Sequence, residues 1–352
     1  MKPVNTKILK VSKNADTAAD IENLKYAADV IKRGGLVAFP TETVYGLGAS
    51  ALDGRAVEAI FEAKGRPQNN PLIIHLCDKS DIGKYCDISG VKDLEKLTAL
   101  MPAPLTVIVP KKDVIAPQVT AGNEGVAFRI PESVIARKLI EFSGVPIAAP
   151  SANLSGKPSP TCAGHVIEDM TGRADVIIDG GDCEVGVEST IITLCTEPPT
   201  LLRPGGVTYE TLLGLLGDVD ISHAVLESLK EGEKVLSPGM MYKHYSPNTP
   251  VTLVKGEREN IIDFINAKCI TENCAVICYN EDAEKINGKN VLCAGTRLDN
   301  TVYASRLFSL LRDADALGTS RIYAVLPEDT SGISLAIYNR MLRAAGFDVR
   351  EA

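Results

Sequence analysis

Short apolar runs, separated by polar and turn-forming residues, mark the expected strands in the first part of the chain. Several of these runs follow one another without a helical pattern between them, which predicts a mixed sheet rather than a purely parallel one. A helix is expected over residues 54–64, with Asp53 as its N-cap. The expected strands are 36–39, 72–76, 105–109, 126–130, 146–149, 176–179 and 189–194.

Alternation within two of these runs separates their side chains into two faces. In the run 126–130, Val126, Phe128 and Ile130 share one face, and Arg129 lies on the other beside Ala127. A cation in that position faces water or a ligand. In the run 72–76, His75 shares a face with Ile73. A histidine on a strand is compatible with a structural role as well as with binding.

The last hundred residues show a regular alternation of predicted strands and helices. Apolar runs at 251–254, 274–278, 290–293 and 322–326 alternate with helical patterns near 257–268, 301–316 and 334–345. This order predicts a smaller, doubly wound, Rossmann-like parallel sheet. No G-x-G-x-x-G follows the first of these strands, so nucleotide binding by this part alone is not indicated.

Three segments are therefore expected: a domain over residues 1–215, a linker over 216–250 and a second α/β domain over 251–352. The linker contains the stretch 237–247 (SPGMMYKHYSP), whose prolines and glycine favour a stiff connection. Its two tyrosines, two methionines and histidine indicate packing on another surface, either the interface between the domains or a ligand pocket.

Composition limits the possible partners and compartments. The 352 residues are long enough for two domains, and 45% of them are hydrophobic. A net charge of −8 argues against sequence-independent nucleic-acid binding, although a local basic pocket is compatible with it. The chain has neither a signal-peptide pattern nor a long apolar span, which predicts a cytoplasmic protein. Its nine cysteines form no C-x-x-C motif and are expected to be reduced and structural.

Two short segments combine groups that suit phosphate. Residues 64–72 (KGRPQNNPL) place a lysine, an arginine and two amides around a glycine and prolines, and residues 150–153 (PSAN) follow an apolar strand. Helix termination explains Lys64, Gly65 and Pro67 equally well, and a cap or Asx turn explains Ser151 and Asn153. Hydrolase motifs such as G-x-S-x-G and H-E-x-x-H are missing from the sequence.

Motifs along nearly the whole chain resemble those of the YrdC-like threonylcarbamoyl-AMP synthases. They are residues 40–47 (PTETVYGL), 64–67 (KGRP), 70–72 (NPL), 149–153 (APSAN), 187–190 (VEST) and 202–205 (LRPG). The linker motif and residues 336–340 (AIYNR) resemble the long, two-domain branch of that family. The resemblance implies an N-terminal YrdC-like α/β domain with a twisted mixed sheet, followed by the smaller Rossmann-like domain.

The resemblance also implies a reaction. L-threonine, bicarbonate and ATP, with Mg²⁺ on the triphosphate, would give L-threonylcarbamoyl-AMP and pyrophosphate. The product would supply the group that a tRNA threonylcarbamoyl transferase machinery places on adenosine 37 of tRNAs reading codons that begin with A. The enzyme would be a nucleotidyltransferase that works mainly by holding two anions together and neutralising developing charge.

Site residues follow from the matching motifs. By resemblance, Lys64 and Arg66 are the catalytic residues and contact the phosphates. The resemblance implies that the ATP site contains Lys64, Arg66, Asn70, Gly125, Ser151, Asn153, Ser159, Arg203 and the linker residue Tyr245. It implies that L-threonine is held by Thr43, His75, Arg129, Ala149 and Ser189. Arg129 suits the threonine carboxylate, because a guanidinium matches a carboxylate with two hydrogen bonds.

Two positions depart from the family pattern. Ala103 stands where relatives usually have glycine, and Gly125 stands where they commonly have threonine, so that a nucleotide contact at Gly125 would use its backbone. Two other functions use the same residues: RNA binding without catalysis, and carbamoyl transfer to a different acceptor. The acidic net charge and the lack of basic tracts favour the synthase over RNA binding.

Overall fold

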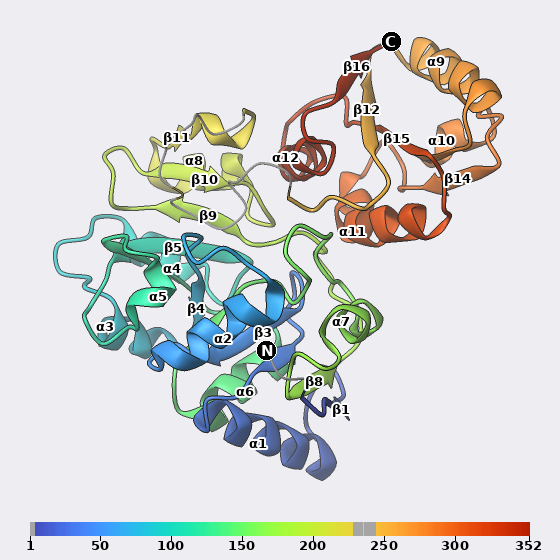
Figure 1. Ribbon diagram of the computed structural model, residues 1–352. Helices are drawn as coiled ribbons and strands as arrows, with labels where there is room; N and C mark the ends of the chain where they lie inside the picture. The colour runs from blue at the N-terminus through green and yellow to red at the C-terminus, as the bar shows by residue number, and fades with distance from the viewer. Residues whose placement is uncertain (1–3, 228–234, 236–243) are drawn as a thin grey trace.

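A computed structural model describes residues 4–227, 235 and 244–352 of the chain (Figure 1). The segment 237–243, with most of the linker motif, lies outside the described residues. Two sheets organise the rest, one of eleven strands and one of five. None of the helices in the described ranges is long and apolar enough to cross a bilayer.

The first sheet is mixed, as predicted, and its strand order is β1-β8-β2-β3-β7-β4-β6-β5-β9-β10-β11. It combines parallel pairs, such as β4 with β6, and antiparallel pairs, such as β5 with β6. Its strands are β1 (Lys7–Lys10), β2 (Val37–Phe39), β3 (Gly46–Ser50), β4 (Ile73–His75), β5 (Leu105–Pro110), β6 (Gly125–Arg129), β7 (Ile147–Ala149), β8 (Val176–Asp179), β9 (Thr190–Thr193), β10 (Thr200–Arg203) and β11 (Asp220–Ile221).

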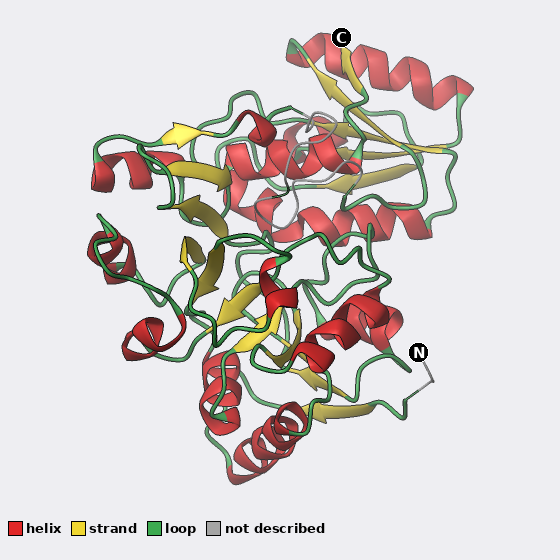
Figure 2. Cartoon of the chain, turned by 60° about the vertical axis from the view of Figure 1, so that its left-hand side comes forward, coloured by secondary structure: helices red, strands yellow, loops and turns green. Residues whose placement is uncertain are grey.

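Helices cover this sheet on both sides (Figure 2). They are α1 (Ala18–Lys32), α2 (Gly54–Lys64), α3 (Ile82–Tyr85), α4 (Leu94–Ala99), α5 (Pro117–Thr120), α6 (Val134–Ser143), α7 (Ala163–Met170) and α8 (Tyr209–Leu216), with 3-10 turns at Lys79–Asp81 and His223–Val225. Helix α2 begins and ends as predicted, since the Asp53 carboxylate accepts from the N–H groups of Arg55 and Ala56. Helices α1 and α6 pack together against β2 and β8.

The predicted alternation is confirmed in β4 and β6. Ile74 and Phe128 are buried in the main core cluster, whereas Ile73 and Ala127 belong to a small apolar cluster on the opposite face. His75 lies opposite Arg129 in the parallel pairing of β4 with β6. The face that carries His75 and Arg129 is the one on which the candidate site lies.

The second sheet has the order β14-β13-β15-β12-β16, and all its pairings are parallel, as predicted. Its strands are β12 (Val251–Lys255), β13 (Cys274–Cys278), β14 (Asn290–Cys293), β15 (Arg321–Val325) and β16 (Val349–Glu351). The helices are α9 (Arg258–Thr271), α10 (Asn280–Ala283), α11 (Asn300–Ala316) and α12 (Ser334–Ala344). Strand β16 was not foreseen in the sequence.

The boundary expected at residue 215 falls before the end of the first sheet, because β11 pairs in parallel with β10. Helices α11 and α12 connect the two parts of the molecule. Arg312 of α11 donates to the carboxylate of Asp169 at 2.6 Å and to the carbonyl of Pro158 at 2.7 Å. Val44 and Val187, from loops of the first part, pack in the apolar cluster of the second. The second part thereby reaches the loops around the candidate site.

Candidate active site

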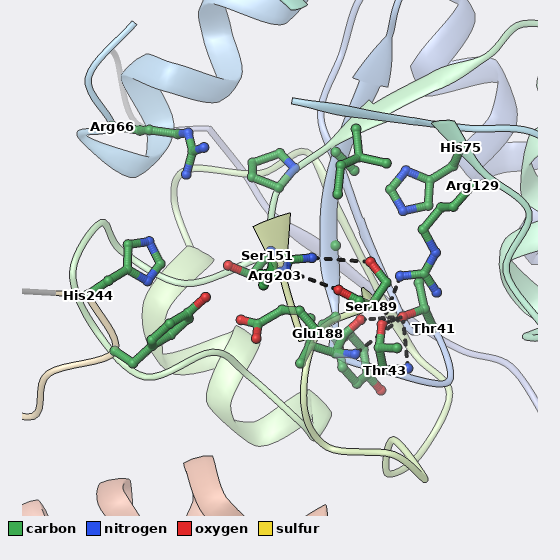
Figure 3. A pocket seen from close by; sticks show the side chains of 17 residues that line it. Thr41, Thr43, Arg66, His75, Arg129, Ser151, Glu188, Ser189, Arg203 and His244 are labelled. Carbon is green, nitrogen blue, oxygen red and sulfur yellow. Dashed lines mark hydrogen bonds between the residues drawn. The ribbon is translucent and has the colours of Figure 1, made fainter. Parts of the chain in front are cut away.

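A pocket on the His75 and Arg129 face of the middle strands gathers residues from many parts of the sequence (Figure 3). We call one end of it the Arg129 side, formed by Thr43, His75, Arg129, Ala149 and Ser189, and the other end the Arg66 side, formed by Arg66, Ser151, Arg203 and Tyr245. The lining also includes Thr41, Val44, Tyr45, Gly46, Ile73, Pro150, Glu188 and His244.

Arg129 is fixed by the loop that follows β2. Its guanidinium donates to the Thr43 hydroxyl at 3.0 Å and forms a buried ion pair with Glu42. The other Glu42 carboxylate oxygen accepts from the backbone N–H of Glu132 at 3.1 Å. The Nε atom of Arg129 is buried and has no hydrogen-bond partner among the described residues. Arg129 is therefore held firmly and keeps a donor for a ligand.

His75 is a neutral member of the Arg129 side. Its Nδ1 atom lies 3.3 Å from the carbonyl oxygen of Ile147, and its ring meets Phe39 edge to face at 5.9 Å. Burial, with the nearby charge of Arg129, lowers the pKa of His75 to about 3. An uncharged imidazole can hydrogen-bond to a ligand without adding to the positive charge of Arg129.

Ser189 and Arg203 meet where β9 begins and β10 ends. Arg203 donates from Nε to the Ser189 carbonyl at 3.0 Å and from a terminal nitrogen to the Ser189 hydroxyl at 3.1 Å. The same hydroxyl lies 2.8 Å from that of Thr106. Burial lowers the pKa of Arg203 to about 10, which leaves the guanidinium charged at neutral pH.

Arg66 enters the pocket directly after α2. Gly65 takes the left-handed conformation at the end of the helix, with φ of 62°, and turns the chain toward the pocket. The Arg66 guanidinium donates to the carbonyls of Asn70 at 3.4 Å and Pro71 at 3.1 Å, and its buried Nε has no partner within the described residues. Burial lowers its pKa to about 10, so this side chain is also cationic at neutral pH.

Lys64 does not line the pocket. Its buried side-chain nitrogen donates to the main-chain carbonyls of Ser151 and Asn153 and thereby ties α2 to the loop after β7. Burial and the neighbouring Arg66 charge lower the pKa of Lys64 well below its usual range. In this arrangement Lys64 supports the loop, and its expected phosphate contact stays a prediction.

Of the other residues predicted to bind ATP, some line the pocket and others lie behind it. Ser151 lines the pocket, whereas Asn153 folds its own loop by donating to the carbonyls of Leu154 at 2.8 Å and Lys157 at 2.9 Å. Ser159 lies behind the pocket and donates to the Glu188 carboxylate at 2.6 Å. Asn70 is buried next to Arg66, outside the lining.

Gly125 lies apart from the pocket. It begins β6, opposite Pro110 of β5, whereas Arg129 ends the same strand. Four strand residues correspond to about 13 Å at the usual rise. The structure therefore leaves the expected backbone contact between Gly125 and a nucleotide unsupported.

His244 and Tyr245 line the Arg66 side. Their rings lie 4.1 Å apart, and the Tyr245 ring stacks at a tilt on Phe308 of α11, 5.1 Å away. Burial and the Arg66 charge lower the pKa of His244 to about 3. The position of Tyr245 in the lining agrees with the expectation that the end of the linker reaches the pocket.

Comparisons with known proteins match nearly the whole chain. A sequence model of the family described as "Telomere recombination" covers residues 29–205, and one described as "Threonylcarbamoyl-AMP synthase, C-terminal domain" covers residues 207–346. The threonylcarbamoyl-AMP synthase of Pyrococcus abyssi is 41% identical over 338 residues, 93% of this chain and 95% of that protein. The chain belongs to the threonylcarbamoyl-AMP synthase family.

Two further relatives support this assignment. The threonylcarbamoyl-AMP synthase of Bacillus subtilis is 43% identical over 326 residues, 91% of this chain and 92% of that protein. The crystal structure of P. abyssi Sua5 complexed with L-threonine matches with a TM-score of 0.90 and 39% identity, covering 98% of this chain and 99% of that one. The resemblance and the fold class inferred from the sequence are thus confirmed.

Sequence reasoning within this synthase family missed three residues of the site: Glu188 and His244, which line the pocket, and Glu42, which lies behind Arg129. Glu42 and Glu188 stand inside quoted motifs but were given no role, and His244 was passed over in favour of its neighbour. A carboxylate beside a site for anions has no evident role in the sequence until its cationic partner is known. The partners, Arg129 and Arg340, lie 87 and 152 residues away in the sequence, and only the folded chain brings them together.

Proposed function

We propose that this member of the synthase family condenses L-threonine, bicarbonate and ATP into L-threonylcarbamoyl-AMP and releases pyrophosphate, as a nucleotidyltransferase. The observation that supports this most is the convergence of Arg66, Arg129 and Arg203 on one pocket from three separate elements. Such an arrangement suits two anionic substrates, an amino acid and a nucleotide, that must react with each other.

The Arg129 side suits the amino acid. Arg129 keeps a buried donor, the Thr43 and Ser189 hydroxyls lie beside it, and neutral His75 adds polarity without charge. A carboxylate at the guanidinium would leave the threonine amine directed along the pocket toward the Arg66 side. The amine attacks the carbon of bicarbonate, and loss of water gives an N-carboxylate on threonine.

The Arg66 side suits the phosphates. An oxygen of the N-carboxylate attacks the α-phosphorus of ATP, and the bond from that phosphorus to the oxygen of the leaving pyrophosphate breaks. Arg66 and Arg203 would neutralise the charge that develops on the phosphate oxygens, from fixed positions in a buried pocket. The product is a mixed anhydride between the carbamate and AMP.

Mg²⁺ would enter as part of the substrate, bound to the triphosphate. Residues 4–227 and 244–352 contain no group of three or more His, Cys, Asp or Glu side chains arranged to hold a metal ion. A magnesium–ATP complex would bring its own ligands, and the arginines of the pocket would contact the remaining phosphate oxygens.

The product would be consumed by a tRNA threonylcarbamoyl transferase machinery, which transfers the threonylcarbamoyl group to adenosine 37 of tRNAs reading ANN codons. A mixed anhydride hydrolyses easily in water. A pocket lined by buried side chains, among them Tyr245, would shield the anhydride from water until the product is released.

The decisive experiment follows pyrophosphate and the adenylate product while each substrate is omitted in turn. The full-length protein with ATP, Mg²⁺, L-threonine and bicarbonate should form both products in equal amounts. Omission of threonine or of bicarbonate should stop both. Pyrophosphate release that continues unchanged without threonine would show a different reaction.

A further inference from the structure

Glu188 is a carboxylate in the wall of a pocket that otherwise gathers guanidinium groups. It is buried, and one of its oxygens accepts from Ser159 at 2.6 Å. The other accepts from Nε of Arg340 at 2.7 Å. Arg340 belongs to α12 in the second part of the chain and is completely buried. The two parts of the molecule thus share an ion pair at the edge of the pocket (Figure 3 shows Glu188 between Arg203 and His244).

Arg340 is fixed in place by its own helix. A terminal nitrogen of its guanidinium donates to the Asn339 side-chain oxygen at 2.7 Å, and the Asn339 amide donates to the Val225 carbonyl at 2.6 Å. The guanidinium carbon also lies 5.7 Å from the centre of the Tyr245 ring. These contacts use the motif at residues 336–340, to which sequence reasoning assigned no role.

Two guanidinium groups, those of Arg340 and Arg203, interact electrostatically with the Glu188 carboxylate. Burial disfavours its charge, but the guanidinium groups of Arg340 and Arg203, together with the Ser159 hydrogen bond, lower the pKa of Glu188 to about 2. Arg203 is held by Ser189, the residue next to Glu188, and lines the same pocket. Of the two described guanidinium groups that lower the pKa of Glu188, Arg203 is the one that would remain without Arg340, and a buried carboxylate requires a partner.

We propose that Arg340 is a positioning residue: by pairing with Glu188, it prevents this carboxylate from neutralising Arg203 and so keeps the Arg66 side of the pocket cationic. The second domain then supplies a charge that the nucleotide needs, although Arg340 itself does not line the pocket. This inference rests on the proposed function, in which Arg203 contacts the phosphates of ATP.

The test measures the affinities of the full-length protein for a non-hydrolysable ATP analogue and for L-threonine, separately, by calorimetry. In Arg340→Met, the Kd for the nucleotide should rise about tenfold, because a buried neighbouring carboxylate cancels much of the Arg203 charge. The Kd for threonine should change less than about twofold, since Arg129 has its own partner in Glu42.

A second substitution distinguishes charge balance from structural damage. In Arg340→Met combined with Glu188→Gln, neither charge is present, and the Kd for the nucleotide should return to within about threefold of the wild-type value. Glu188→Gln alone removes the competing carboxylate and should bind the nucleotide at least as tightly as the wild type. The double variant also serves if Arg340→Met alone does not fold, because it leaves neither buried charge without its partner.

Arg343→Met is the matched control. Arg343 is a buried arginine on the same helix that donates to the Ala224 carbonyl, outside the pocket lining. Its loss should lower the stability of the fold and leave the Kd for the nucleotide within about twofold. A general effect of removing a buried arginine from α12 would instead weaken nucleotide binding in both variants.

Three results would overturn the inference: wild-type nucleotide affinity in Arg340→Met, a double variant that binds as poorly as Arg340→Met, or a large loss of affinity in Glu188→Gln. A different result would contradict the proposed function itself. A wild-type protein that neither binds the nucleotide nor forms pyrophosphate would remove the proposed function and this inference with it.

Discussion

On the Arg129 side of the pocket, hydrogen-bonded strands carry most of the side chains, whereas on the Arg66 side three of the four side chains come from loops and only Arg203 comes from a strand, at the end of β10. His75, Arg129 and Ala149 lie on the neighbouring strands β4, β6 and β7. All five residues expected to bind threonine line the pocket. Of the nine expected to bind ATP, the four that line it are Arg66, Ser151, Arg203 and Tyr245.

The difference has a physical cause. Along a strand, successive side chains point to opposite faces, so the face of Arg129 follows from the apolar neighbours that must be buried. In a loop, polar side chains also have to satisfy backbone groups. Lys64 and Asn153 do so, since their hydrogen bonds go to main-chain carbonyls of the loop after β7. A motif rich in phosphate-binding groups therefore includes residues that shape the loop.

Arg66→Ala should have the largest effect and would confirm that the Arg66 side handles the reacting phosphates. Removal of a fixed cation that stabilises developing charge should lower kcat about 100- to 1000-fold. Pyrophosphate release at saturating substrates measures this. Arg55→Ala, on the exposed side of the same helix, should retain wild-type turnover. Near-normal kcat in Arg66→Ala would mean that the arginine only ends the helix and braces the Asn70 loop.

Arg129→Lys should affect the Arg129 side of the pocket and the binding of L-threonine. The charge is retained, but the planar guanidinium that contacts Thr43 and Glu42, and whose Nε has no partner among the described residues, is lost. The KM for threonine should rise about 10- to 100-fold, the value expected when a charge-assisted hydrogen bond is lost. The Kd for an ATP analogue should stay close to that of the wild type. Equal losses for both substrates would contradict the division of the pocket into two sides.

The features of the fold and of the site that could be predicted from the sequence are those in which the interacting residues lie close together along the chain. The fold class, the limits of α2 and the two faces of β6 follow from local pattern, because the burial of apolar side chains decides them. Strand β3 was missed: its sequence, GLGAS, contains two glycines and lacks the usual branched residues. The ion pairs of Glu42 and Glu188 were missed because their partners come from distant elements.

Lys64→Met tests whether Lys64, next to the Arg66 side, only supports the loop after β7 or also binds the phosphates of ATP. The substitution leaves the carbonyls of Ser151 and Asn153 without their buried donor, which should lower the free energy of unfolding by about 1 to 3 kcal/mol. Urea denaturation measures this loss. If Lys64 turns to the phosphates when ATP binds, kcat will fall as steeply as in Arg66→Ala; if it remains a support, the Kd for ATP will rise more than kcat falls.

Gly125→Ala should have the smallest effect on function and addresses the expected ATP contact that the structure supports least. The new methyl group would meet Cγ2 of Ile108 at 2.8 Å, so the edge of β6 must shift slightly, at a cost of about 1 kcal/mol in stability. Because Gly125 and Arg129 stand at opposite ends of the strand, this shift should not reach the pocket. The Kd for ATP is expected to change less than about twofold, within the scatter of surface substitutions. A tenfold weaker affinity for ATP, with threonine affinity unchanged, would place the nucleotide along β6 and extend the Arg66 side beyond the residues assigned to it.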